Sequence, residues 1–161
     1  MRKIIRKGGC CSAGTEADRK PVDSDMTICF IGNPNCGKTT LFNAYTGANL
    51  KVANWPGVTV EKVEGTYKYK DEKIRLVDLP GTYSLTSYTM EETVSRNYIL
   101  SGDVDVVINV VDASSLERGL YLTLQLLELS KPVVVALNMM DIVMKRGMEI
   151  DLHRLPEMLG V

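Results

Sequence analysis

The chain has 161 residues, 45% of them hydrophobic, and a formal net charge of -1 at pH 7. This length predicts one domain with a buried core, and the slightly acidic balance argues against a nucleic-acid-binding protein that works through a broad basic field. Cysteines at positions 10, 11, 29 and 36 fit neither a disulfide framework nor a closed zinc site, and they indicate a reducing, cytosol-facing environment. No apolar run approaches the roughly 20 residues of a membrane-spanning helix.

Residues 1–25 are rich in charge, glycine and serine and have no hydrophobic period. We therefore expect a flexible basic tail. Its basic residues could contact anionic lipid or a partner, although a solvated tail is the favoured interpretation. Cys10 and Cys11 alone are too few for a closed metal site. The folded domain is expected over residues 26–161.

From residue 26 onward, strand and helix patterns alternate. Apolar runs predict buried strands over 27–31, 74–77, 104–111 and 133–137. Helical spacing and end signals predict helices over 38–46, 91–100, 116–127 and 152–159. The charged segment 60–69 predicts an edge strand paired with 74–77, and residues 49–58 have a loop composition. This order predicts an α/β fold, with a mostly parallel sheet, helices on both faces and one antiparallel edge hairpin.

The first strand is followed by Gly32-Asn33-Pro34-Asn35-Cys36-Gly37-Lys38-Thr39. This run fits G-x-x-x-x-G-K-[ST], the phosphate-binding loop, in the strand-then-helix context that the pattern needs. Backbone N–H groups of such a loop surround a phosphate, and the positive end of the helix points at it. We expect Lys38 to reach the terminal phosphates and the Thr39 hydroxyl to hold Mg²⁺, with Thr40 also at the nucleotide.

A second motif, Asp78-Leu79-Pro80-Gly81, ends the predicted strand 74–77. A carboxylate at Asp78 can hold Mg²⁺ through water, and the Gly81 N–H can face a γ-phosphate. Alone, the segment fits a plain Pro-Gly turn. The phosphate-binding pattern upstream favours a role at the nucleotide.

A third motif, Asn138-Met139-Met140-Asp141, follows the predicted strand 133–137. Asp141 can accept two N–H bonds from the edge of guanine, and adenine offers no matching donor pair. Charge-assisted bonds of about 1.5–3 kcal/mol each make this a useful filter. Asn138 can contact the base and brace the loop, and Met139 can supply the apolar contact of the lysine that is commoner there. The motif predicts a preference for GTP.

Between the first helix and the predicted edge strand lies Asn54-Trp55-Pro56-Gly57-Val58-Thr59-Val60. Thr59 is expected to close over Mg²⁺ and the γ-phosphate and to let go after hydrolysis. Gly57, Val58, Val60 and Glu61 are expected at the nucleotide with it. Taken singly, these residues also fit a surface loop with one anchoring tryptophan.

These motifs, in this order, resemble the translation-factor-related GTPases with a Ras-like P-loop fold. The runs 54–61 and 116–125 further resemble the cytosolic GTP-binding (G) domain of the FeoB family of bacterial and archaeal ferrous-iron transporters. The resemblance covers most of residues 26–161. It implies a GTPase on the cytosolic face of the cell membrane, followed by a helical domain and a membrane domain. By that pattern the chain is truncated before a fifth guanine-contacting loop, a final strand and a final helix.

The resemblance also implies a mechanism, in which GTP is hydrolysed slowly to GDP and phosphate with Lys38, Asn35, Thr59 and Gly81 as catalytic residues. Mg²⁺ would be held by Thr39, Thr59 and Asp78. Asn35 matches an asparagine that helps to hold K⁺ beside the phosphates in related GTPases, so K⁺ is expected to stimulate hydrolysis; a loop-shaping hydrogen bond is the alternative role.

Cys36 replaces the more usual serine or alanine of that loop. A thiol at a helix N-terminus can have a lowered pKa and be redox-sensitive. A small tolerated residue is the favoured interpretation.

The expected partners are GTP, the following domains of the same protein, small Feo accessory proteins and further copies of the chain, without nucleic acid. A ribosome-assembly GTPase of the Era or Der type is an alternative, since that group shares the Pro-Asn-x-Gly-Lys loop but attaches basic RNA-binding domains. A nucleotide-dependent tether with little turnover, and a broader nucleotide specificity, also stay open. No cluster of His, Cys and carboxylates at ligand spacing marks an iron site.

Overall fold

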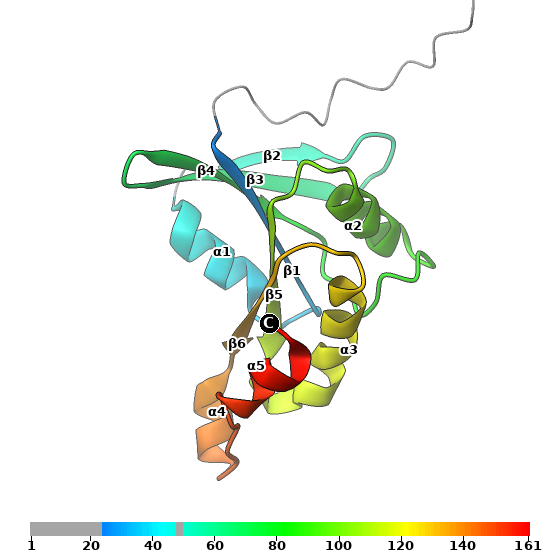
Figure 1. The fold of residues 1–161 in the computed structure, drawn as a ribbon. Helices are drawn as coiled ribbons and strands as arrows, with labels where there is room; N and C mark the ends of the chain where they lie inside the picture. The colour runs from blue at the N-terminus through cyan, green and yellow to red at the C-terminus, as the bar shows by residue number, and fades with distance from the viewer. Residues whose placement is uncertain (1–23, 48–49) are drawn as a thin grey trace, which may run out of the picture.

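The computed structural model describes residues 24–47 and 50–161, so all but the last two residues of the expected tail lie outside the described residues. Within these ranges six strands form one sheet (Figure 1). The strands are β1 (Met26–Gly32), β2 (Leu50–Asn54), β3 (Glu61–Tyr69), β4 (Glu72–Asp78), β5 (Val106–Asp112) and β6 (Val133–Asn138). The helices are α1 (Lys38–Thr46), α2 (Met90–Leu100), α3 (Leu116–Leu127), α4 (Met140–Lys145) and α5 (Arg154–Leu159), and the 3-10 turn η2 (Ala113–Ser115) precedes α3.

The strand order is β2-β3-β4-β1-β5-β6. β1 pairs in parallel with β4 and β5, and β5 pairs in parallel with β6. β3 pairs antiparallel with both β2 and β4. The predicted α/β fold with an antiparallel edge is confirmed. Because β1, β4, β5 and β6 are parallel, their carboxyl ends and the three predicted motifs meet at one edge of the sheet.

The antiparallel edge is one strand wider than predicted. The sequence predicts a loop over 49–58 and an edge strand over 60–69, but β2 pairs with β3 from Leu50↔Gly65 to Asn54↔Glu61 and forms the edge itself. All five β2 side chains are exposed. The strand therefore has no alternation of buried and exposed residues, and only its backbone pairing defines it.

Helix α4 is a second departure from the sequence prediction, which places only the loop 138–141 in this region. The helix begins at Met140, directly after β6. With six residues it spans less than two turns, too few for a helical period to show in the sequence.

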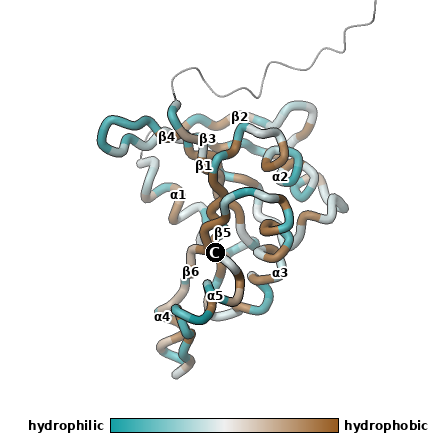
Figure 2. Tube along the Cα trace, in the orientation of Figure 1, coloured by the Kyte–Doolittle hydropathy of each residue, from teal (hydrophilic) through white to brown (hydrophobic). Residues whose placement is uncertain are grey.

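Helices cover both faces of the sheet. On one face α1 places Phe42 edge-on against Phe30, with 5.5 Å between ring centroids. On the other face α2 and α3 bury Tyr98, Ile99 and Leu122 in a second apolar cluster. Figure 2 shows the hydrophobic residues concentrated along β1 and β5, between these layers. The core therefore fixes the carboxyl ends of the central strands, and the predicted motifs continue from these ends.

Two local features fix the helices on the second face. α3 approaches β5 closely because Gly119 has no side chain; a Cβ there would lie 2.4 Å from Val111 Cγ1. α2 begins with a capping box, in which Thr89 and Glu92 exchange side-chain and backbone hydrogen bonds. Over the described ranges, no helix combines the length and the apolar character needed to cross a membrane.

Candidate nucleotide-binding site

The loop between β1 and α1 has a conformation that depends on glycine. Gly37 has φ 84, in the left-handed region, and forms the N-cap of α1. A Cβ on Gly37 would lie 2.2 Å from Asn138 Nδ2, and one on Gly32 would lie 2.4 Å from the carbonyl oxygen of Val110. The loop is thus pressed against β5 and the end of β6. Asn35 also has a positive φ, 65.

This loop forms one side of an open cavity of about 580 Å³. Gly81, from the loop after β4, and Met139, from the loop after β6, line it as well. The other lining residues are Asn33, Pro34, Asn35, Gly37, Lys38, Thr39 and Thr40. Backbone hydrogen bonds from Leu79 N to Phe30 O (2.9 Å) and from Thr82 N to Gly32 O (3.1 Å) tie the two loops together. We call this space the phosphate cavity.

Lys38, which lines this cavity, forms a buried ion pair with Asp78, in which Lys38 Nζ donates to Asp78 Oδ1. Each residue is only 8% exposed. Burial raises the pKa of the Asp78 carboxyl above its ordinary value, and the charge of Lys38 with hydrogen bonds from Lys38 and Thr39 offsets part of that rise. The lysine that the motif assigns to phosphate is therefore paired internally, and a phosphate would have to compete for it.

The third motif contacts the first through its asparagine. Asn138 Nδ2 donates to the carbonyl oxygen of Cys36 at 2.9 Å, so the end of β6 braces the phosphate-binding loop. Met139 has φ 61 and forms the N-cap of α4. Asp141 lies in the first turn of α4, where its exposed carboxylate pairs with Lys145 at 3.3 Å. The acceptor expected at a guanine edge is thus open to solvent.

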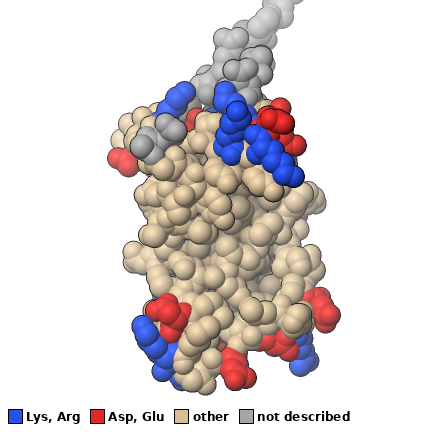
Figure 3. All heavy atoms as spheres, turned by 90° about the vertical axis from the view of Figure 1, so that its left-hand side faces the viewer, with Lys and Arg blue, Asp and Glu red and all other residues tan. Residues whose placement is uncertain are grey.

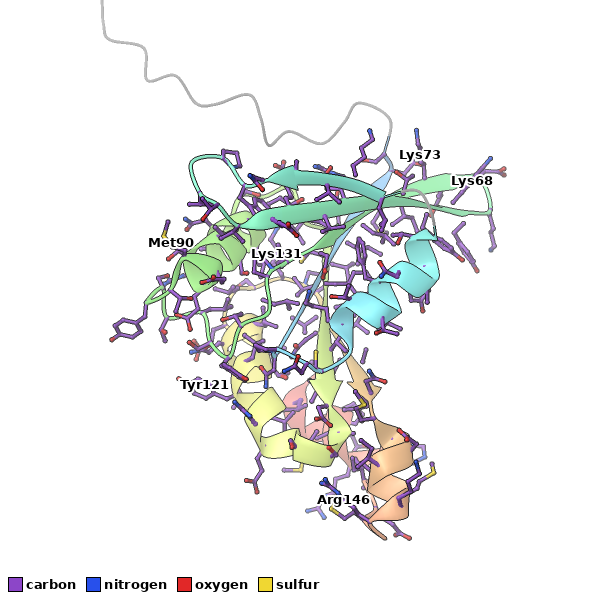
Figure 4. The ribbon with its side chains drawn as sticks, turned by 180° about the vertical axis from the view of Figure 1, so that it is seen from behind. Lys68, Lys73, Met90, Tyr121, Lys131 and Arg146 are labelled. Carbon is purple, nitrogen blue, oxygen red and sulfur yellow. The ribbon has the colours of Figure 1, made fainter. Side chains whose placement is uncertain are left out.

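The Thr59 loop (residues 55–60) is the connection between β2 and β3. The loop is closed by hydrogen bonds from Trp55 N to Val60 O (2.9 Å) and from Val58 N to Trp55 O (3.2 Å). In Figures 1 and 4 this turn lies beside α2, away from the loop that joins β1 to α1. Accordingly, Gly57, Val58, Thr59, Val60 and Glu61 are absent from the lining of the phosphate cavity. The structure gathers the other motifs and leaves this loop apart.

The residues that hold segment 82–89 were not predicted from the sequence. The Glu92 carboxylate accepts hydrogen bonds from Ser84 Oγ (2.7 Å), Thr86 Oγ1 (3.2 Å) and Tyr88 N (2.9 Å). From α3, Gln125 Oε1 accepts a bond from Leu85 N at 2.8 Å. The pattern Thr89-x-x-Glu92 could have indicated the first of these as a capping box; no sequence pattern links Gln125 to residue 85.

The Cys36 thiol lies against the same loop and is not placed for redox chemistry. Cys36 is 1% exposed. Burial raises its pKa, and nearby backbone hydrogen bonds and the charge of Lys38 only partly oppose this. The prediction of a lowered pKa at this helix N-terminus is therefore wrong, and Cys36 acts as a small residue packed in the core.

The donors near the phosphate cavity suit a hard cation. The Thr39 hydroxyl hydrogen-bonds to the Asp78 carboxylate, and oxygen atoms of this kind are what Mg²⁺ prefers. Among the described residues, no group of three or more His, Cys, Asp or Glu side chains is placed to hold a metal by itself. Any metal here would share its coordination with phosphate oxygens and water.

Residues 26–161 match the family model described as ferrous iron transport protein B. The Fe(2+) transporter FeoB of Salmonella typhimurium is 58% identical over 139 residues, which make up 84% of this chain and 18% of that relative. The Fe(2+) transporter FeoB of Escherichia coli strain K12 is 57% identical over the same shares. This chain thus spans less than a fifth of the length of these relatives.

Solved structures give the same result. The G domain of the T. maritima FeoB iron transporter has a TM-score of 0.78 at 48% identity, covering 84% of this chain and 82% of that chain. An S. thermophilus NFeoB mutant bound to mGDP has a TM-score of 0.82 at 50% identity, covering 86% and 53%. The cytosolic domain of L. pneumophila FeoB has 0.79 at 52% identity, covering 84% and 59%. The chain shares its fold with these domains.

Proposed function

Because this chain belongs to the ferrous iron transport protein B family and forms its N-terminal G domain, we propose that the phosphate cavity binds GTP with Mg²⁺ and hydrolyses it slowly to GDP and phosphate. The observation that carries this proposal is that Lys38, which follows β1, and Gly81, which follows β4, line one cavity, with Lys38 paired to Asp78 at the end of β4. The family match and these relatives give no support to a ribosome-assembly GTPase of the Era or Der type.

Each cavity residue has a role in this proposal. Lys38 would leave Asp78 and neutralise charge on the terminal phosphates, and the Gly81 N–H would face the γ-phosphate. Thr39, Asp78 through water, and Thr59 after movement of its loop would hold Mg²⁺. The metal would supply charge neutralisation at the phosphate oxygens. Residues 32–40, Leu79 and Pro80 would form the phosphate cradle.

Potassium dependence is a finer part of the proposal. Asn35 is exposed and lines the phosphate cavity, so its amide oxygen is available to a cation beside the phosphates. We expect K⁺ to accelerate hydrolysis relative to Na⁺, and Asn35→Ala to abolish this acceleration while nucleotide binding survives. The measurement is the rate of phosphate release in matched K⁺ and Na⁺ buffers. Equal rates in the two buffers for the unaltered chain would contradict a K⁺ site.

Base recognition would use the loop after β6. In the proposal Asp141 exchanges its exposed partner Lys145 for the guanine edge, while Asn138 and Met139 hold the loop and Met140 continues into α4. An exposed ion pair contributes little to stability, so its exchange costs little. GTP would then bind more tightly than ATP.

The larger protein is also part of the proposal. β6 is half-exposed although it is apolar, and an open cavity of about 270 Å³ lies between it and α5. Figure 3 shows an uncharged middle between two charged ends on this side of the molecule. Tyr45 of α1 and Val134 of β6 are exposed. We propose that a further strand and helix cover this side and complete the G domain.

The relatives are more than five times as long as the matched segment, which supports further domains. We propose that these are a helical domain and a membrane domain. The chain would work on the cytosolic face of the membrane, where the nucleotide state gates the passage of Fe²⁺. Small Feo accessory proteins and further copies of the chain are proposed partners. Nucleic acid is not one, since the net charge of -1 provides no basic field for it.

A further inference from the structure

We propose that Trp55, Lys62 and Tyr98 form a latch that holds the Thr59 loop against α2, away from the phosphate cavity. Lys62 is then a positioning residue that sets how readily Thr59 reaches the bound nucleotide. The inference deepens the proposed function, because it rests on Thr59 acting at the Mg²⁺ and γ-phosphate of GTP.

The latch joins three elements through one buried ammonium group. Lys62 lies on β3 and is only 6% exposed. Its Nζ lies 4.5 Å from the ring centroid of Trp55, directly after β2, and 5.4 Å from that of Tyr98 on α2. The two rings meet at 4.9 Å between centroids. A cation held between two aromatic faces and out of water is strongly attracted to both.

The charge of Lys62 is balanced from the same strand. Lys62 Nζ lies 3.0 Å from Glu64 Oε1, and the same oxygen accepts a hydrogen bond from Arg75 Nη2. Burial opposes the charge of Glu64, but hydrogen bonds from Arg75 and Lys62 more than offset it, so its pKa lies below the ordinary value. The ammonium is therefore fixed in place, and the indole packs on a fixed partner.

The position of Trp55 controls that of Thr59, because the segment between these two residues is short and closed by hydrogen bonds. Three residues separate Trp55 from Thr59, and backbone hydrogen bonds of Trp55 with Val58 and Val60 span that interval. Val58 and Val60 also pack against the core cluster that contains Trp55. Thr59 cannot move to the phosphate cavity while all these contacts persist.

Opposing terms keep the latch near balance. Trp55 Nε1 and the Tyr98 hydroxyl are buried, and neither has a hydrogen-bond partner among the described residues. Buried donors without partners disfavour the closed arrangement, whereas the contacts of Lys62 favour it. A balanced element of this kind is what a γ-phosphate can shift.

This balance predicts opposite effects for two substitutions. Lys62→Met keeps the length of the side chain and removes the charge, so it should open the latch. Tyr98→Phe keeps the ring and removes the unpartnered hydroxyl, so it should close the latch further.

Trp55 provides a direct measurement, because it is the one tryptophan of the chain. In the nucleotide-free chain, acrylamide should quench its fluorescence about threefold more strongly in Lys62→Met, given the strength of a desolvated cation–π contact, and less strongly in Tyr98→Phe. Lys68→Met is the matched control: Lys68 is exposed on the same strand (Figure 4) and should leave quenching unchanged. Circular dichroism checks that each variant is folded.

Binding of a non-hydrolysable GTP analogue with Mg²⁺, compared with GDP, tests the positioning role. Lys62→Met should raise the affinity for the analogue about three- to tenfold, because a smaller fraction of the protein has the latch closed and Thr59 away from the phosphate cavity. The affinity for GDP should stay constant. Tyr98→Phe should lower the affinity for the analogue. Unchanged quenching in both variants, or equal shifts for the analogue and GDP, would overturn the proposal.

Thr59→Ala separates this proposal from the proposed function. This substitution should weaken binding of the analogue without affecting binding of GDP or the quenching of Trp55. If Thr59→Ala has no effect on analogue binding, the role of Thr59 in the proposed function fails; the quenching of Lys62→Met and Tyr98→Phe still decides whether the latch exists.

Discussion

At the scale of single residues, the site depends most on positions where no other side chain fits. Gly37 combines a positive φ with a neighbour that leaves no room for a Cβ. The Lys38–Asp78 pair is the opposite case, in which two charges are buried and each needs the other or a substitute. In the proposed function, a phosphate would replace Asp78 as the partner of Lys38.

Gly37→Ala tests the first of these positions. The new Cβ would collide with Asn138 Nδ2 and break the brace between β6 and the phosphate-binding loop, in addition to the strain of the left-handed backbone. We expect a loss of stability of about 2–3 kcal/mol, the sum of the conformational term and one lost buried hydrogen bond. Chemical unfolding monitored by circular dichroism measures it.

Gly147→Ala is the matched control for this substitution. Gly147 has φ 65 and nothing within 4 Å of its Cβ position, so only the backbone strain of about 1–2 kcal/mol applies. Equal losses for the two variants would show that the contact between Gly37 and Asn138 contributes nothing.

At the scale of elements, helix α2 contacts both segment 82–89 and the Thr59 loop. Its N-terminus holds segment 82–89 through Glu92, and its last turns hold the Thr59 loop through Tyr98. Segment 82–89, which follows the second motif, and the Thr59 loop, which connects β2 and β3, are thus both held by α2. A change at either loop can therefore reach the other through α2.

The Glu92 contacts predict a pH dependence of stability. The hydrogen bond from the Ser84 hydroxyl lowers the Glu92 pKa, with weaker opposition from burial and further lowering by Tyr88, Thr89 and Thr86, from an ordinary value of 4.5. A carboxyl whose pKa is lower in the folded state stabilises that state above its ordinary pKa, and the contribution is lost as the pH falls through the folded value. The stabilisation should be complete near pH 7 and decline below 4.5.

Glu92→Gln removes this contribution, so its stability deficit should be largest at neutral pH and shrink in acid. Thermal unfolding across the pH range measures the difference. Glu91→Gln, an exposed neighbour on the same helix, serves as the control and should track the unaltered chain. A deficit for Glu92→Gln that stays constant below pH 4.5 would argue against an ionised Glu92 in the network.

The sequence predicts elements well where burial imposes a period. The strands near 27–31 and 133–137 and the helix 116–127 follow from apolar patterns, and the phosphate cavity follows from motifs at strand ends. β2 could not be predicted because all its side chains face solvent. The position of the Thr59 loop could not be predicted either, because it depends on contacts of Trp55 with β3 and α2 that no local pattern encodes.

At the scale of the whole molecule, one sheet edge collects the three motifs that follow β1, β4 and β6, whereas the Thr59 loop lies apart from them. The two faces of the sheet differ in what covers them. The face of α2 and α3 is closed by a large core cluster. The face of α1 extends to a half-exposed apolar β6. The nucleotide would bridge loops from β1, β4 and β6, so its binding is expected to stabilise the whole sheet by mass action.

Selectivity for the base is the most direct test of the proposed guanine nucleotide site. Calorimetric titration should show GTP with Mg²⁺ binding about tenfold or more tightly than ATP, a difference of one good charge-assisted contact. Asp141→Asn replaces two acceptor oxygens by one acceptor and one donor. The variant should therefore bind GTP more weakly and XTP more tightly, because the base of XTP carries a carbonyl where guanine carries an amino group. Equal affinities for GTP and ATP, or an Asp141→Asn variant with unchanged GTP binding, would contradict the claim.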